Sequence, residues 1–196
     1  KTIDAVDLKL VRDEWFALVD HTNFGSCAPH VKGDEALMAG GETVRLRGHN
    51  NDLIDAYAAR PLGPGPFPNV LVVHHMPGWD EWNWETTRRY AQHGFLAICP
   101  NLYVRAGHGT PEDVAATVRS QGGVPDDQVV GDIEGAINWV RSQRDATGKV
   151  GLFGTCSAGR HSFLAACRLG DQVDAIIDCW GGNVVQPDEN LTPNQP

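Results

Sequence analysis

The fold of this sequence is decided by the stretch Lys149-Val150-Gly151-Leu152-Phe153-Gly154-Thr155-Cys156-Ser157-Ala158-Gly159. An apolar run leads into the cysteine, and a small-residue pattern typical of a helix leads out of it as far as Leu169. A strand, a sharp turn and a helix with a nucleophile at the bend form a nucleophile elbow. Because such a turn is strained, the residues two before and two after the nucleophile must be small, and Gly154 and Ala158 meet that need.

Cys156 is the candidate nucleophile of this turn. The start of the following helix would favour its thiolate, through the helix dipole and the free N–H groups of the first turn. The N–H of Ser157 would then be one donor of an oxyanion hole. The alternative is that Cys156 is a buried structural cysteine in a glycine-rich turn, because many buried cysteines are inert.

Length and composition limit the classes of protein to be considered. The 196 residues predict a single domain, and the 41% hydrophobic and 21% charged residues are those of a globular protein. The net charge of −9 argues against a nucleic-acid or anionic-membrane partner. No apolar run approaches the roughly 18 residues of a membrane span. Five cysteines without close spacing predict neither a disulfide framework nor a zinc site, and favour a cytoplasmic location.

Strand and helix patterns alternate along most of the chain. The first two predicted strands form a hairpin, and the later strands read as buried runs. The predicted helix over 83–93 has arginines that we expect to face water, and the helix over 126–144 has an inner stripe of Val129, Val130, Ile133, Ile137 and Val140. A short helix is expected from Pro111, and a proline-rich connector over 61–68. The predicted strands are 43–47, 53–59, 69–73, 95–99, 149–153 and 173–179.

This order predicts an α/β fold with a sheet that is parallel after its first strands and has helices on both faces. Ligands of such sheets bind at the carboxyl ends of the strands. The segment His74–Trp79 and the turn at Cys156 both fall at such ends. The site is therefore expected where these two segments meet.

Three motifs resemble the dienelactone hydrolase family (carboxymethylenebutenolidases) of the α/β-hydrolase fold. They are the elbow over 154–159, the segment Cys99-Pro100-Asn101-Leu102-Tyr103, and the helix start Asp132-Ile133-Glu134-Gly135-Ala136-Ile137. The similarity covers the stretch 43–182, which we expect to be the α/β-hydrolase core. Residues 1–42, with a helix expected within 1–20, would then be an N-terminal arm and loop, and 183–196 a polar tail or connector.

The resemblance implies hydrolysis of a small lactone or ester through a thioester on Cys156, with no cofactor. It implies that the N–H of Met76 is the second oxyanion donor. The family's glutamate is replaced here by His75, which can also take up the thiol proton at neutral pH. Because successive side chains of a strand face opposite ways, His74 and His75 are not both expected at Cys156. The alternative is that one is a packed histidine and the other has no catalytic duty.

Two further positions are candidate substrate contacts. Trp79, in a cluster with Trp82 and Trp84, would wall a substrate pocket, or else would anchor its loop on the core. The resemblance implies that Arg105 holds a substrate carboxylate, whereas the alternative is a solvated loop arginine. Three other cysteines, Cys99, Cys167 and Cys179, are interpreted as small core residues.

The resemblance also implies a triad that this stretch of sequence does not complete. In this fold the nucleophile, the acid and the histidine follow one another in that order along the chain, each after a later strand. One predicted strand follows the elbow, and His161 is turned about 140° from Cys156 around the helix. We therefore expect the front part of a longer hydrolase without its C-terminal strands, with the Asp and His in the remainder or in a second polypeptide.

Two other interpretations of the protein's function stay open beside that of a cysteine hydrolase. The protein could be a non-catalytic member of the fold, retained for binding or assembly. It could also be a thiol redox sensor, although no resolving cysteine lies near Cys156 in the sequence. The partner of the leading interpretation is a small-molecule ester or lactone, and a homo-oligomer is also possible.

Overall fold

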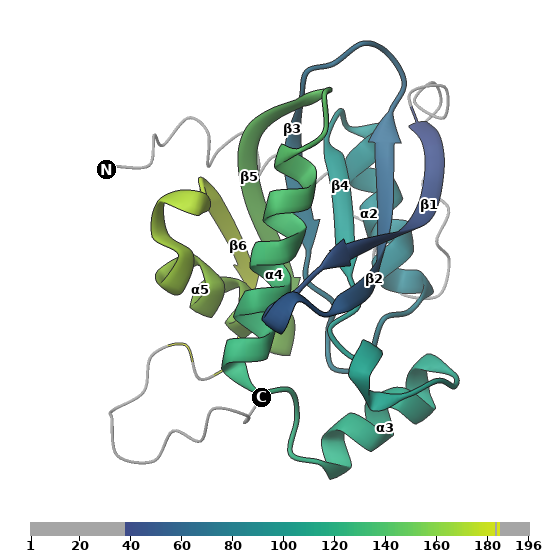
Figure 1. The fold of residues 1–196 in the computed structure, drawn as a ribbon, viewed down its shortest axis with the longest axis vertical. Helices are drawn as coiled ribbons and strands as arrows, with labels where there is room; N and C mark the ends of the chain where they lie inside the picture. Colours follow the sequence, from purple (N-terminus) through teal and green to yellow (C-terminus); the bar gives the residue numbers. More distant parts are fainter. Residues whose placement is uncertain (1–37, 183, 185–196) are drawn as a thin grey trace.

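The computed structural model describes residues 38–182 and 184, which form one mixed sheet with helices on both faces (Figure 1). The strands are β1 (Met38–Arg47), β2 (Leu53–Pro61), β3 (Phe67–Val72), β4 (Leu96–Pro100), β5 (Ala146–Thr155) and β6 (Ala175–Cys179). The helices are α2 (Glu81–Gln92), α3 (Pro111–Ser120), α4 (Asp126–Arg141) and α5 (Ser157–Leu169), with short 3-10 turns η2 (His49–Asn51), η3 (Val104–Ala106) and η4 (Gly170–Gln172). The helix predicted within 1–20 lies outside the described residues, as does the tail predicted over 183–196 apart from residue 184.

The six strands follow the order β1-β2-β4-β3-β5-β6 across the sheet. β2 is antiparallel to both β1 and β4, whereas β3 is parallel to β4 and β5, and β5 is parallel to β6. This confirms the predicted α/β sheet that is parallel after its first strands. The parallel strands bring their carboxyl ends to one edge, where the elbow and the loop after β3 lie.

Four strands, β1, β2, β3 and β5, are longer than the sequence predicts. β1 begins at Met38, before the predicted start at residue 43. β3 begins at Phe67, inside the proline-rich stretch that was predicted to be irregular. The pairing of β3 with β5 shifts register between Phe67 and Asn69, so Pro68 sits where the ladder is already interrupted.

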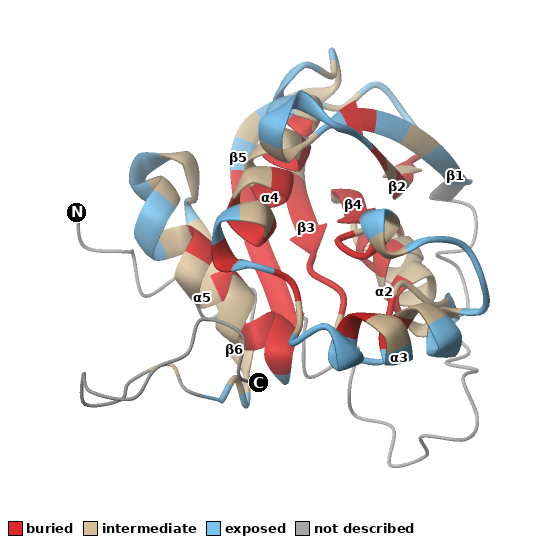
Figure 2. Ribbon diagram, turned by 60° about the horizontal axis from the view of Figure 1, so that its bottom comes forward, coloured by how far each residue is buried: buried red, intermediate tan, exposed pale blue. Residues whose placement is uncertain are grey.

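The two faces of the sheet are covered by different helices. Val70 and Val72 of β3 pack in a cluster with Tyr90 of α2, whereas Leu71 and Val73 pack with residues of α4 and α5. Figure 1 shows α2 behind the sheet and α4 in front of it, and Figure 2 shows the buried strands between them. The predicted inner stripe of α4 is confirmed, because all five of its residues are buried.

The arginines of α2 do not face water, so that prediction is wrong. The side chains of Arg88 and Arg89 are only 22% and 15% exposed. Arg88 donates to the Tyr57 hydroxyl at 3.0 Å and pairs with Glu81 and Glu85 of its own helix. Their charges are satisfied by these partners, which lets the long side chains lie against the protein surface.

Two further predictions of burial are corrected. β6 is half-buried along its whole length rather than buried, because within 38–182 and 184 it pairs with β5 alone. Cys167 is exposed and Cys179 is half-buried, whereas Cys99 is buried as predicted.

Over the described ranges, no helix combines the length and the apolar character that a membrane crossing requires.

Candidate active site

The turn between β5 and α5 has the geometry of a nucleophile elbow. Cys156 is the single residue between the two elements and has φ 55° and ψ −125°, a strained conformation for a residue with a Cβ atom. Its N–H donates to the carbonyl of Cys179 at 2.9 Å, and its own carbonyl accepts from the N–H of Gly159 at 3.0 Å. The side chain of Cys156 is exposed and its thiol is free.

Small residues make this turn possible. A Cβ atom on Gly154 would lie 2.2 Å from the carbonyl oxygen of Ala158, a backbone atom that cannot easily move. A Cβ atom on Gly159 would lie 2.1 Å from a carboxylate oxygen of Asp178 on β6. The elbow therefore holds its shape because β5, the first turn of α5 and the end of β6 approach one another without intervening side chains.

Ser157 is the first residue of α5, and backbone N–H groups in a first helical turn have no acceptor within the helix. Such an N–H is available to an oxyanion at the elbow. The Ser157 side chain is buried, and its hydroxyl has no hydrogen-bond partner among the described residues.

The loop after β3 carries Met76, whose N–H is the second predicted oxyanion donor. Hydrogen bonds within the loop and to the segment after β4 hold it in place. The Tyr103 hydroxyl donates to the carbonyl of Met76 at 3.3 Å, and the N–H of Gly78 donates to the carbonyl of His75 at 3.0 Å. His74 is buried and accepts from the N–H of Leu102 through Nε2 at 3.0 Å. Since Nε2 accepts, Nδ1 carries the proton and donates to the His75 carbonyl at 3.0 Å. His74 is thus a neutral structural histidine.

This neutrality makes stability depend on pH. Burial lowers the pKa of His74 from 6.5 to about 4, so the unfolded chain binds a proton at a higher pH than the folded one. The free energy of unfolding should therefore fall by about 1.4 kcal/mol per pH unit between these values as the pH is lowered. We expect the free energy of unfolding of His74→Gln, measured in denaturant, to depend less steeply on pH between pH 7 and pH 4.5 than that of the wild type.

A second buried histidine, His161, does not disturb this comparison of the wild type with His74→Gln. Burial also lowers the pKa of His161 to about 4, and this contribution is present in both proteins and cancels in the difference. Equal pH slopes for the wild type and His74→Gln would contradict the buried neutral state of His74.

His75 contacts residues at the start of α2. Its Nε2 lies 3.1 Å from a carboxylate oxygen of Asp80, the residue that caps α2, and its ring stacks on Trp82 with centroids 4.9 Å apart. The hydrogen bonds to His75 and to the N–H of Asn83 lower the pKa of Asp80, against the opposing effect of burial. Within the described ranges no histidine is hydrogen-bonded to Cys156.

The predicted substrate contacts both have protein partners. The Trp79 indole donates to the Cys99 carbonyl at 3.0 Å and packs edge-on against Trp84. The Arg105 guanidinium makes two bonds to the carboxylate of Asp132, at 2.8 and 3.0 Å, and a third to Asp52 at 2.8 Å. These contacts anchor two loops, and a substrate role for either residue stays a prediction.

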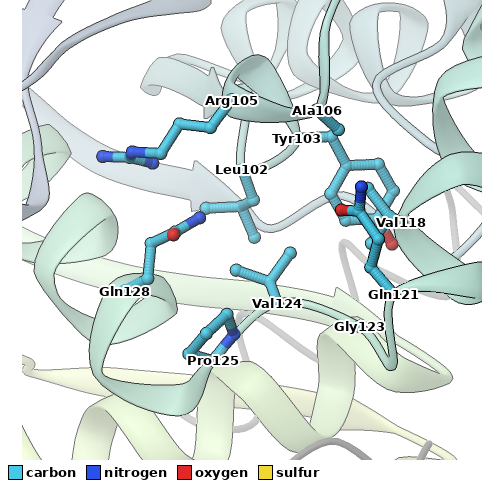
Figure 3. Close-up of a pocket in the computed structure, with 10 residues that line it drawn as sticks. All are labelled: Leu102, Tyr103, Arg105, Ala106, Val118, Gln121, Gly123, Val124, Pro125 and Gln128. Carbon is cyan, nitrogen blue, oxygen red and sulfur yellow. The ribbon is translucent and has the colours of Figure 1, made fainter.

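A hollow of about 100 Å³, open to solvent, lies beside the segment after β4 (Figure 3). Arg105 extends along its rim on the same side as Gln128 (Figure 3). None of its lining residues belongs to the elbow, but Leu102 and Tyr103 line it and also hold the loop after β3. The lining residues are Leu102, Tyr103, Arg105, Ala106, Val118, Gln121, Gly123, Val124, Pro125 and Gln128.

In the part of the chain that the structure describes, no three His, Cys, Asp or Glu side chains are placed to hold a metal ion.

The end of β6 is the part of the site that the sequence did not indicate. Trp180 is 70% exposed and has φ 51°, which is strained for a bulky residue, and it lies between Cys179 and Gly181. A Cβ atom on Gly181 would lie 2.6 Å from the backbone nitrogen of Arg160 in α5. This close approach depends on strand pairing between distant segments, so no local pattern could have predicted it.

The strand order and the elbow define an α/β-hydrolase-fold protein, and solved structures agree. A Klebsiella pneumoniae protein provisionally called a dienelactone hydrolase matches with TM-score 0.63 and 28% identity, over 80% of this chain and 65% of that one. A bacterial brefeldin A esterase, at 19% identity and TM-score 0.54, shares the fold over 88% of this chain and 46% of that one.

The family follows from the sequence comparison. The model of the dienelactone hydrolase family matches residues 54–195, and the chain belongs to this family. A provisionally named carboxymethylenebutenolidase of Methylorubrum extorquens is 34% identical over 82% of this chain and 54% of its own length. Carboxymethylenebutenolidase of Pseudomonas putida is 28% identical over 71% of this chain and 61% of its own. The chain thus spans between about half and two thirds of the length of these relatives.

Proposed function

We propose that this protein hydrolyses a small ester or lactone by nucleophilic catalysis at Cys156. The observation that carries the proposal is the exposed Cys156 thiol on a strained turn at the start of α5. Strained positions cluster at catalytic sites, and the helix start supplies N–H groups to a developing oxyanion. Membership of the dienelactone hydrolase family supports the same reaction class.

In this proposal the Cys156 thiolate attacks the carbonyl carbon of the substrate. The N–H groups of Ser157 and Met76 stabilise the resulting oxyanion. Its collapse breaks the acyl C–O bond and forms a thioester and an alcohol, which stays joined to the acyl chain when the substrate is a lactone. Water then hydrolyses the thioester to release the acid and restore the thiol. An aspartate and a histidine outside the described residues, from this protein or from a second polypeptide, complete the proton transfers.

His75 would enter the reaction only by leaving its present partners. It would have to exchange the Asp80 carboxylate and the Trp82 ring for the Cys156 thiol. This arrangement favours a second candidate function, a non-catalytic protein of the same fold that binds a ligand or a partner. A cytoplasmic location and a homo-oligomer stay predictions.

Alkylation separates the two candidate functions. We expect iodoacetamide at pH 6 to modify Cys156 at least about tenfold faster than Cys167, because the thiolate is the reactive form and Cys156, unlike Cys167, lies at a helix start. Cys167 is the matched control, since it is also exposed and lies within α5, the helix that Cys156 precedes. Equal rates at the two residues, measured by peptide mass spectrometry, would favour the non-catalytic function.

A further inference from the structure

A second cysteine lies beside the candidate nucleophile, on the neighbouring strand. β5 and β6 are parallel, and Thr155 is paired directly with Cys179 at the end of β6. The backbone N–H of the next residue, Cys156, donates to the carbonyl of Cys179 at 2.9 Å. Residues 156 and 179 are distant in sequence, and both of their thiols are free.

The backbone spacing suits a disulfide. A direct hydrogen bond between neighbouring strands places the two Cα atoms about 5 to 6 Å apart, within the range of about 4.4 to 6.8 Å that disulfides span. In a regular strand, Cys156 would face away from Thr155 and Cys179. Its φ of 55° breaks the strand at this residue, so this alternation no longer applies to its side chain.

The two thiols differ in their access to solvent, and the surroundings of Cys179 disfavour its thiolate. Cys156 is exposed, whereas Cys179 is half-buried. Burial, together with the carboxylate of Asp178, raises the pKa of the Cys179 thiol. An oxidant in solution therefore meets Cys156 first, and Cys179 stays reduced until a partner sulfur forms beside it.

We propose that Cys156 and Cys179 form an intramolecular disulfide when hydrogen peroxide oxidises Cys156. The disulfide is a reversible modification that removes the candidate nucleophile from reaction and keeps it from irreversible oxidation. It depends on Cys156 being a reactive thiol, as the proposed function also requires, but it does not depend on hydrolysis.

The chemistry takes two steps. The Cys156 thiolate attacks one oxygen of hydrogen peroxide, the O–O bond breaks, and a sulfenic acid forms while hydroxide leaves and takes up a proton to become water. The Cys179 sulfur, losing its proton, then attacks the Cys156 sulfur, the S–O bond breaks, and a second water leaves. Two thiols are oxidised to one disulfide while one peroxide is reduced to two waters.

Intact-mass spectrometry and peptide mapping after mild peroxide treatment test the proposal. The wild type should lose about 2 Da, yield a Cys156–Cys179 cross-linked peptide, and stop reacting with iodoacetamide at Cys156 until dithiothreitol is added. Cys179→Ala should instead gain about 32 or 48 Da at Cys156, because sulfinic and sulfonic acids form where no second thiol resolves the sulfenic acid. Cys167→Ala, the matched control, should behave like the wild type.

The failure of this proposal can be told from that of the proposed function. A Cys156 that iodoacetamide alkylates rapidly, but that peroxide converts to the sulfinic acid in the wild type as in Cys179→Ala, overturns the disulfide alone. A Cys156 that reacts with neither reagent overturns both. A cross-link from Cys156 to any other cysteine also overturns the assignment of Cys179.

Discussion

Gly154→Ala is expected to destabilise the protein by about 3 kcal/mol or more and to abolish the selective alkylation of Cys156. The added Cβ atom would lie 2.2 Å from the carbonyl oxygen and 2.3 Å from the carbonyl carbon of Ala158. Both are backbone atoms of α5, so relief requires the helix to move away from β5. That movement would open the turn that holds Cys156 in its strained conformation.

Gly151→Ala is the matched control for this change. It lies on the same strand, but its Cβ atom would approach nothing closer than 3.9 Å, an ordinary contact. We expect its free energy of unfolding to change by no more than about 0.5 kcal/mol in denaturant unfolding, with alkylation of Cys156 retained. Similar losses for the two variants would contradict the account of the elbow.

Asp132→Ala is expected to cost about 3 kcal/mol of stability. The Asp132 side chain is 0% exposed, pairs with Arg105 through both oxygens, and accepts the N–H of His49 at 2.8 Å. Its removal leaves Asp52 as the one carboxylate partner of the Arg105 guanidinium among the described residues, and it leaves the His49 N–H without its acceptor. Thermal or denaturant unfolding measures the loss.

Asp127→Ala tests whether burial causes this effect. Asp127 belongs to the same helix and pairs with Arg168, but its side chain is 80% exposed. Exposed pairs contribute about 0 to 1 kcal/mol, so this variant should lie within that range. If Asp132→Ala lost no more stability than Asp127→Ala, Arg105 would be free of its structural role, and its predicted contact with a substrate carboxylate would gain weight.

The main elements of the fold could be predicted because their signals are local. The strand over 69–73 is a continuous run of residues suited to burial on both faces, and α4 shows its stripe at helical spacing. The start of β3 at Phe67 was missed because a proline normally ends a strand, and the register shift that accommodates Pro68 is a property of pairing with β5. The extent of burial of Arg88 was likewise missed, because it depends on the Tyr57 hydroxyl from β2.

The candidate site divides in the same way. The elbow could be located from Gly154, Cys156 and Ala158, because a strained turn imposes residue sizes at fixed spacing. The hydrogen bond from Cys156 to Cys179 and the Asp80 partner of His75 could not be foreseen. One depends on the order of the strands in the sheet, and the other on the position of a helix start relative to the loop after β3.

Trapping the acyl-enzyme tests the central claim most directly. The protein is incubated with p-nitrophenyl acetate, quenched in acid and mapped by mass spectrometry, with Cys156→Ser as the comparison. We expect an acetyl group of about 42 Da on Cys156, removable by hydroxylamine as a thioester is. Acetylation confined to lysines, or equally fast at Cys167 and Cys156, would contradict the assignment of Cys156 as the nucleophile.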